Sequence, residues 1–150
     1  MLPVVVAVAV ALAQAGCGGD EEAPAAVGVV QGWISAVQDG DGAAACDLMV
    51  LTANGEVVQE PESGCIPLMS GAAAGQPIAA GATAREPGEE CAEEPDQQSA
   101  YVLVELHGGF THCVEVVDSE AGLQLNASDA ITLVSLDTTS PEQRYRRVSL

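Results

Sequence analysis

Residues 101–117 read YVLVELHGGFTHCVEVV, and this stretch decides the fold class that we expect. Both of its halves are rich in Val, Leu, Tyr and Thr, which are residue types that favour β-strands. Gly108 and Gly109 separate the halves, and consecutive glycines between two strands are a strong signal of a two-residue hairpin turn. The sequence therefore predicts antiparallel strands over residues 101–107 and 110–117.

The chain on either side of this hairpin also carries strand-like segments. Residues 122–126, 130–137 and 144–150 have the same composition, and we expect them to continue the hairpin as an antiparallel meander. Residues 56–59 predict one further short strand. Residues 66–84 mix Ala, Gly and Pro, which predicts only a weak helix and a loop.

The region before these strands follows a helical period instead. Residues 24–38 place their apolar side chains on one stripe of a helix, at Val27, Val30, Trp33, Ile34 and Val37. The sequence Asp-Gly-Asp-Gly at residues 39–42 ends this helix and is typical of an interhelical turn, and a second short helix is predicted over residues 43–51. Helices followed by a meander predict an α+β domain in which the helices pack on one face of the sheet.

The chain opens with an apolar leader. Residues 1–16 read MLPVVVAVAVALAQAG, which is uncharged and shorter than the roughly 20 apolar residues that span a bilayer. This length is typical of a helical secretory signal peptide. The sequence Ala-Gly-Cys that ends at Cys17 resembles the lipobox of bacterial lipoproteins. The resemblance implies that Cys17 is acylated, as with diacylglycerol or palmitate, and becomes the first residue of the mature protein; the alternatives are a plain cleaved signal or an uncleaved anchor.

The leader also sets the domain organisation that we expect. Residues 1–16 would be the signal peptide, and residues 17–24 would be the lipidated cysteine and a polar, flexible tether. Residues 25–150 would form a single α+β domain. This organisation predicts a protein on the extracytoplasmic face of the cell membrane, or a secreted protein if Cys17 carries no lipid.

The cysteine count agrees with an oxidising compartment. Of the five cysteines, Cys17 is assigned to lipid, which leaves Cys46, Cys65, Cys91 and Cys113 as an even set. Three pairings of these four are possible. We favour Cys46 with Cys65 and Cys91 with Cys113, because the members of each pair are close in sequence. The spacings fit no zinc-site pattern, so we predict no metal at these cysteines.

Charge and composition limit the possible partners. The chain has 22 acidic residues against four arginines, a net charge of −18, which excludes nucleic acid as a direct partner by electrostatic repulsion. It contains no phosphate-binding loop, paired CxxC motif, HExxH helix or GxSxG elbow, so we predict no cofactor. Three of the four arginines are Arg144, Arg146 and Arg147. These suggest charge pairing within the domain, with contact to lipid headgroups as the alternative.

Residues 29–49, VVQGWISAVQDGDGAAACDLM, resemble the opening of secreted nuclear-transport-factor-two-like, or SnoaL-like, lipoproteins. In that family a first helix, a Gly and Asp turn and a second helix with a cysteine close over a curved antiparallel sheet to form a cone. The resemblance implies this fold for the present chain. It does not fix an activity, because the same fold supports isomerases, dehydratases and domains that only bind or scaffold.

The strongest candidate site lies on the predicted hairpin. With a two-residue turn, Glu105 pairs with His112 and His107 pairs with Phe110, and all four side chains share one face while Cys113 points to the other. Glu105, His107 and His112 would then converge, either for proton transfer or as ligands of a divalent metal. The alternative is that both histidines are surface residues near a hairpin tip.

These observations leave three hypotheses for the function. The favoured one is a non-enzymatic, lipid-anchored domain that binds a small apolar ligand or a protein partner at the cell envelope, because export signals are present and catalytic motifs are not. The second is an isomerase-like or dehydratase-like enzyme with the cone fold, in which Glu105 or His112 is the general base. The third is a structural interaction module whose acidity serves solubility.

Overall fold

The computed structural model describes residues 22–53, 56–59, 64–71, 78, 81–91 and 99–135. Its elements confirm the α+β class. In chain order they are α1 (Glu22–Asp39), α2 (Gly42–Asp47), β1 (Met49–Ala53), β2 (Glu56–Gln59), α3 (Cys65–Gly71), β3 (Ala82–Arg85), β4 (Ser99–Leu106), β5 (Phe110–Ser119), β6 (Gly122–Asn126) and α5 (Ala127–Ser135). No helix in these ranges is both long and apolar enough to cross a membrane.

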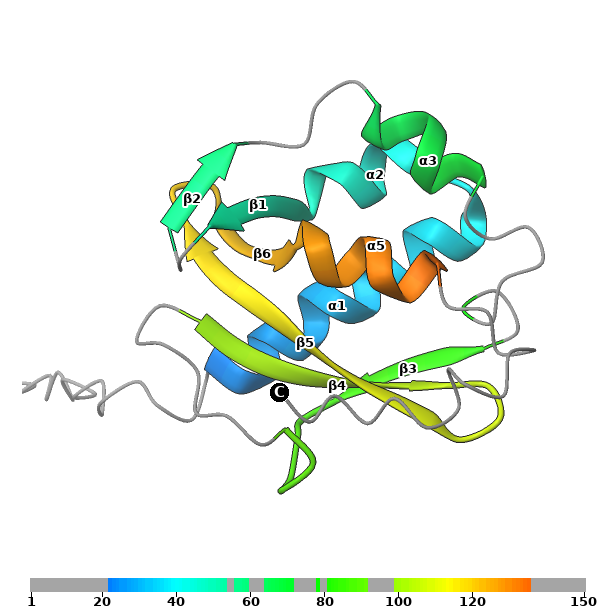
Figure 1. Cartoon of the computed structure of the whole chain (residues 1–150), viewed down its shortest axis with the longest axis vertical. Coiled ribbons are helices and arrows are strands. Elements are labelled where there is room, and N and C mark those ends of the chain that lie inside the picture. The colour runs from blue at the N-terminus through cyan, green and yellow to red at the C-terminus, as the bar shows by residue number, and fades with distance from the viewer. Residues whose placement is uncertain are drawn as a thin grey trace, which may run out of the picture.

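The strands form an open, mixed sheet in the order β2-β1-β6-β5-β4-β3 (Figure 1). Strands β3 to β6 make an antiparallel meander. Strands β4, β5 and β6 confirm predicted strands, whereas β3 lies in a region for which a weak helix and a loop were predicted. Strand β1 instead runs parallel to β6, and β2 extends the sheet as an antiparallel partner of β1. The expectation of a purely antiparallel sheet is therefore wrong. The reason is that β1 follows α2 directly and enters the sheet beside β6, where Leu125 N–H donates to the Leu48 carbonyl at 2.8 Å.

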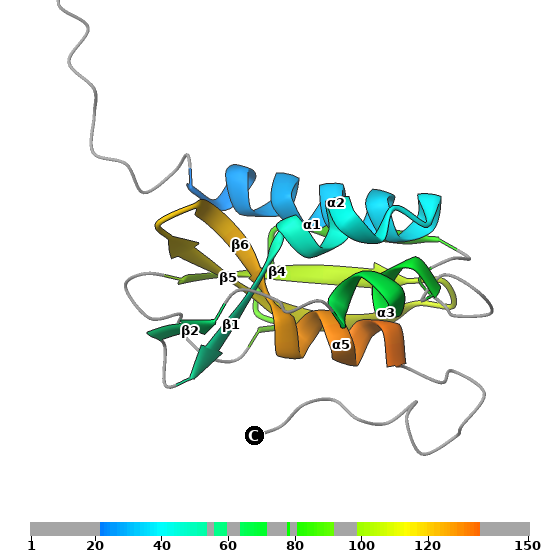
Figure 2. The ribbon, with the colours of Figure 1, turned by 90° about the horizontal axis from the view of Figure 1, so that it is seen from above.

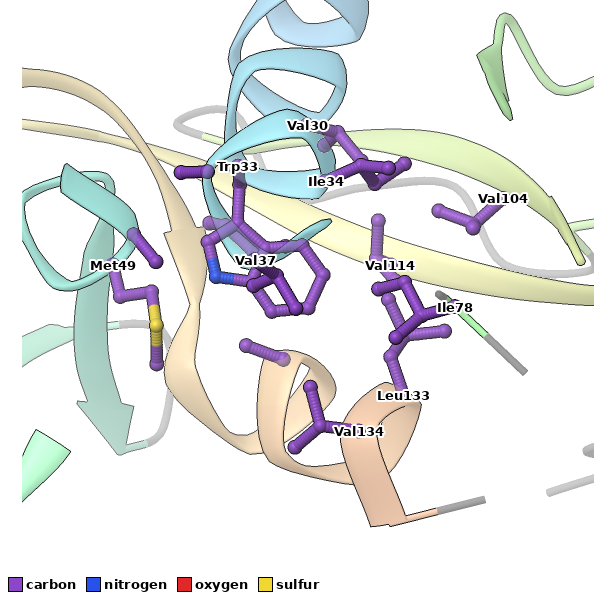
Figure 3. Packing of buried hydrophobic residues seen from close by; sticks show 14 of the residues in the cluster. Val30, Trp33, Ile34, Val37, Met49, Ile78, Val104, Val114, Leu133 and Val134 are labelled. Atoms are coloured by element: carbon purple, nitrogen blue, oxygen red, sulfur yellow. The ribbon is translucent and has the colours of Figure 1, made fainter. Parts of the chain in front are cut away.

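The helices pack on the sheet through apolar side chains. Trp33, Ile34 and Val37 of α1 are fully buried, as the helical stripe predicts. Side chains of α1, of the sheet and of α5 meet in one cluster (Figure 3). Seen from above, α1 runs along the sheet, and α3 and the β4–β5 turn lie toward the C-terminal end of α1 (Figure 2). The β4–β5 turn therefore lies far from Glu22, where α1 begins.

Several predicted boundaries are wrong. Residues 130–137, predicted as a strand, belong to α5 as far as Ser135, since Ala127, Ala130, Leu133 and Val134 form a buried helical stripe. The second helix ends at Asp47, and β1 replaces its predicted last residues. Residues 22–24 are helical and not part of a tether.

Other predictions fall outside the described residues. These are the signal peptide at residues 1–16, Cys17 and the start of the tether, and the final strand at residues 144–150 with its three arginines.

The two favoured disulfides are confirmed. Cys46 pairs with Cys65 and joins α2 to α3, with 6.1 Å between the Cα atoms. Cys91 pairs with Cys113 and joins the loop after β3 to β5, with 5.8 Å between the Cα atoms. Each disulfide closes a loop of about 20 residues, which should stabilise so small a domain by about 3 kcal/mol. The first also holds α3 against Gly42, where any side chain would collide with the Ile66 carbonyl oxygen.

Two glutamines of α1 cover the edge strand β3 and the segment that precedes it. The Gln31 side-chain oxygen accepts a hydrogen bond from the backbone N–H of Ala84 at 3.0 Å. Gln38, two helical turns later, donates from Nε2 to the Ile78 carbonyl at 2.8 Å. These bonds satisfy backbone groups that an uncovered edge would expose.

Candidate functional site

The turn that joins β4 to β5 contains three residues instead of the predicted two. Leu106 pairs with Phe110, so His107, Gly108 and Gly109 form the turn. Gly109 N–H donates to the Leu106 carbonyl at 3.1 Å. Gly108 and Gly109 have φ angles of 94° and 81°, a region that residues with a side chain rarely adopt. The two glycines thus marked the turn correctly, but the turn is one residue longer than they alone indicated.

This extra residue changes which side chains share a face. Glu105 pairs with Thr111, and His112 pairs with Val104. Directly opposite residues share a face and successive residues alternate, so His112 lies on the same face as Val104 and Glu105 lies on the other, together with Cys113. The predicted convergence of Glu105 with His112, and the separation of Glu105 from Cys113, are therefore both wrong.

Glu105 and His107 do remain together, in an open groove of about 460 Å³ at the hairpin tip. The groove is formed by the end of α1, the start of β3 and the β4–β5 turn. Its lining residues are Gln38, Gly81, Ala82, Thr83, Glu105, Leu106, His107, Gly108 and Gly109. The strands hold it in place, because His107 N–H donates to the Gly81 carbonyl at 2.8 Å. The groove presents polar side chains to solvent, and we treat it as the candidate site.

Arg85 forms ion pairs with two acidic residues beside this groove. Arg85 Nη2 lies 3.0 Å from Glu90 Oε1, whereas Arg85 Nε lies 3.8 Å from Glu105 Oε2. The hydrogen bond from Arg85 is the main cause that lowers the pKa of Glu90, and the backbone N–H groups of Glu90 and Gly88 add to it. Because its contact with Glu90 is the shorter one, Arg85 pairs mainly with Glu90. Glu105 therefore keeps a half-exposed carboxylate with only a long ion pair.

His112 lies away from the groove, near the start of α5. Burial lowers its pKa, and the nearby charge of Asp129 partly opposes this shift. Burial likewise raises the pKa of Asp129, against the opposing effects of the Glu115 N–H and of His112. Within the described part of the chain no ion pair joins His112 to Asp129, and each acts on the other through its charge.

Asp129 and Asn126 fasten α5 to the sheet. Asp129 Oδ2 accepts from the Glu115 N–H at 2.8 Å, at a point where β6 has ended and no strand pairs with that side of β5. Asn126 Nδ2 donates to Thr52 Oγ1 and to Glu115 Oε2, at 2.9 Å each. The Asn126 carboxamide oxygen also accepts from the Ser128 N–H at 3.0 Å and so caps α5. Asp129 therefore has a structural role, because its side chain attaches the first turn of α5 to β5.

The space between the helices and the sheet is filled by side chains. Trp33, Met49, Met69, Ile78 and Leu133 are among the large residues that are fully buried there. Trp33 Nε1 is the one buried side-chain nitrogen or oxygen without a hydrogen-bond partner among the residues that the structure describes. Within the same ranges no three His, Cys, Asp or Glu side chains are placed to hold a metal ion. The open groove is therefore the concavity of the described residues that we consider for a ligand.

The sequence alone did not point to Gln38, Thr83 or Gly81, which line the groove together with Glu105 and His107. They come from segments that are distant in the chain, and β3 was not predicted as a strand. A weak signal was available in Gln38, which is a polar residue at the end of an otherwise apolar helical segment.

We compared the chain with known proteins. No protein-family model matches it, and neither a curated protein nor a solved structure is significantly similar to it.

Proposed function

We propose that this protein is a lipid-anchored binding domain on the extracytoplasmic face of the cell membrane, and that it contacts its partner through the groove at the hairpin tip. The observation that carries the proposal is the contrast between an interior in which large side chains are fully buried and an open groove at the surface that includes Glu105 and His107. A filled interior favours recognition at the surface over binding of a small apolar molecule inside the fold.

The cysteines support the proposed location. Cys46, Cys65, Cys91 and Cys113 are all paired, as expected of a protein exported to an oxidising compartment. Cys17 is the remaining cysteine of the chain and stands at the lipobox-like sequence. Acylation of Cys17 would fasten the domain to the membrane, since each buried methylene of an acyl chain contributes about 0.8 kcal/mol.

The position of the groove suits an anchored domain. Helix α1 has 18 residues and is therefore about 27 Å long. It begins at Glu22, five residues after the proposed anchor at Cys17, and Gln38 near its other end lines the groove. An anchor at the start of α1 would leave the groove on the side that faces away from the membrane, where a partner in the envelope can reach it.

The resemblance of residues 29–49 to SnoaL-like lipoproteins adds a proposal about the fold. Helix α1, the turn after it and α2 with Cys46 agree with the opening that the resemblance implies, and on this basis we propose that the helices and sheet form a cone. An enzyme that uses Glu105 and His112 as a pair is not favoured, because these residues lie on opposite faces of the sheet. Glu105 and His107 are both exposed to water, which suits binding better than proton transfer.

The mass of the protein recovered from membranes tests the location. We expect an amino terminus at Cys17 that carries acyl chains, and a gain of four hydrogens when the two disulfides are reduced. A Cys17→Ser variant should leave the membrane fraction while keeping both disulfides. Recovery of the unmodified chain from the cytosol, with its leader intact and its cysteines reduced, would show that the proposed location is wrong.

A further inference from the structure

We infer that the groove at the hairpin tip binds a cationic group with several N–H donors, namely the ammonium or guanidinium group of a lysine or arginine side chain or of a free small cation. The inference rests on the proposed function and names the chemical class of the ligand. Three properties of the groove support it: the hydrogen-bonding character of its lining, its electrostatic field, and its shape.

The lining of the groove offers several hydrogen-bond acceptors. The Glu105 carboxylate accepts hydrogen bonds, and the Thr83 hydroxyl and the His107 imidazole can each accept or donate one. Gln38 already uses its Nε2 to bind the Ile78 carbonyl, so its carboxamide oxygen is the group left for a ligand. The backbone N–H of His107 is also occupied, by the Gly81 carbonyl. A ligand rich in N–H donors matches this set better than a carboxylate or a phosphate.

The electrostatic field at the groove is negative. The neighbouring residues 81–91 contain Glu86, Glu89 and Glu90 against Arg85, a net charge of 1 − 3 = −2. Arg85 is the one lysine or arginine among the described residues, and its shorter contact is with Glu90. Glu105 is therefore only partly neutralised, at 3.8 Å from Arg85 Nε. A cation approaching the groove is attracted, and an anion is repelled.

The shape of the groove suits the end of a long side chain. Gly81, Gly108 and Gly109 contribute backbone without side chains, so the groove stays open beside Glu105. A Cβ atom added at Gly109 would meet no other atom within 4 Å, which shows that this part of the tip is unobstructed. A volume of about 460 Å³ lies within the range of ordinary ligand sites, although this groove is more open than most. We therefore expect a weak contact for a single cationic group.

Titration followed by nuclear magnetic resonance tests the inference on the full chain carrying Cys17→Ser. The probes are three peptides, acetyl-Gly-Arg-Gly-amide, acetyl-Gly-Gln-Gly-amide and acetyl-Gly-Glu-Gly-amide, together with arginine amide as a free cation. We expect the arginine peptide to shift the backbone amide signals of Thr83, Glu105, His107 and Gly108. The Gln and Glu peptides should leave these signals unchanged, and added salt should weaken the effect.

Two matched variants show whether the contact is specific. Glu105→Gln should weaken binding of the arginine peptide about fivefold, since it removes one exposed charge pair. Glu120→Gln removes an equally exposed acid at the β5–β6 turn, at the opposite end of β5, and should leave the affinity unchanged. If both variants weaken binding equally, or if shifts spread over the whole acidic surface, the attraction is non-specific and the inference is overturned.

The remaining outcomes separate the inference from the proposed function. Shifts at the groove with the Gln or Glu peptide, and none with the arginine probes, would overturn the cationic ligand and leave a binding groove in place. If no probe shifts the amide signals of the groove, the cationic ligand and the proposed binding role of the groove are both contradicted. Where the arginine probes bind, stronger binding of the peptide than of arginine amide identifies a polypeptide partner, and equal binding identifies a free small cation.

Discussion

Strands β4 and β5 contribute residues both to the interior of this domain and to the tip of their hairpin. Different physical forces determine the conformation of the chain in these two regions. Val104 and Val114 lie in the interior and are fully buried, so their positions are set by packing. Only a few residues away, His107, Gly108 and Gly109 are exposed, and their positions are set by backbone angles. The comparison shows that packing fixes the fold, whereas backbone geometry at the tip shapes the groove.

The largest effect should come from a cavity in the interior. Leu133 of α5 is 0% exposed and belongs to the cluster that joins α1, α5 and the sheet. Leu133→Ala should lower the free energy of unfolding by about 2 to 5 kcal/mol, since the lost packing is only partly recovered by relaxation. Urea denaturation measures the change.

A control for this substitution lies on the same helix. Ile131 is 44% exposed, so Ile131→Ala should change stability by about 0.5 kcal/mol or less. Equal losses from Leu133→Ala and Ile131→Ala would mean that burial in the cluster does not control the stability of α5, and the proposed contrast between interior and tip would fail.

A smaller effect is expected from the backbone of the tip. Gly109 has a φ of 81° and nothing near its Cα hydrogens, so Gly109→Ala adds strain without a collision. We expect a loss of about 1 to 2 kcal/mol in the free energy of unfolding. Gly109→Asn should cost less, because asparagine adopts positive φ more readily. If alanine and asparagine behave alike, side-chain bulk and not backbone strain governs the tip.

The smallest effect should come from Asp129, in the first turn of α5. Burial raises the pKa of Asp129, so the folded protein binds a proton at a pH where the unfolded chain does not, and the stability of the wild type falls as pH rises through that pKa. Asp129→Asn keeps an oxygen for the Glu115 N–H and removes this titration. Relative to wild type, the variant should therefore gain about 1 kcal/mol or less between pH 4 and pH 7.

Thermal melts of both proteins across this pH range measure that difference. His112 acts in the opposite sense: its pKa is lowered, so stability is lost as pH falls below the ordinary histidine value. Asp129→Asn also removes the charge that raises the pKa of His112, so a change in the His112 contribution enters the measured difference as well. Parallel stability curves for wild type and Asp129→Asn would show that the buried carboxylate does not contribute to the pH dependence.

Elements with a strong period were predictable from the sequence, and those with mixed signals were not. The stripe that includes Trp33 and Val37 identified α1 because five apolar positions agree with one helical face. Residues 130–135 of α5 were misassigned because Ile131, Thr132 and Val134 are β-branched and favour a strand. The Asn126 cap and the helical spacing of Ala130 and Leu133 favour the helix. The spacing stabilises the helix only when the sheet provides a surface against which these side chains are buried.

The candidate site was only partly predictable for a different reason. Glu105 and His107 were predicted to lie near each other because they alternate on one predicted strand, and both line the groove although His107 belongs to the turn. His112 was placed wrongly because a difference of one residue in the turn moves every later side chain to the other face. Gln38 reaches the groove through tertiary packing of α1 on β3, which local sequence patterns do not report.

The hydrogen bonds of Gln31 and Gln38 affect how copies of this protein can associate when they are crowded on a membrane surface. A bare terminal strand invites another chain to add on by main-chain pairing, and repeated addition produces fibres. Here the Gln31 side chain occupies the Ala84 N–H of the edge strand β3, and Gln38 occupies the Ile78 carbonyl in the segment before it. Helix α1 thus leaves fewer backbone groups on this side of the sheet for a neighbouring molecule to pair with.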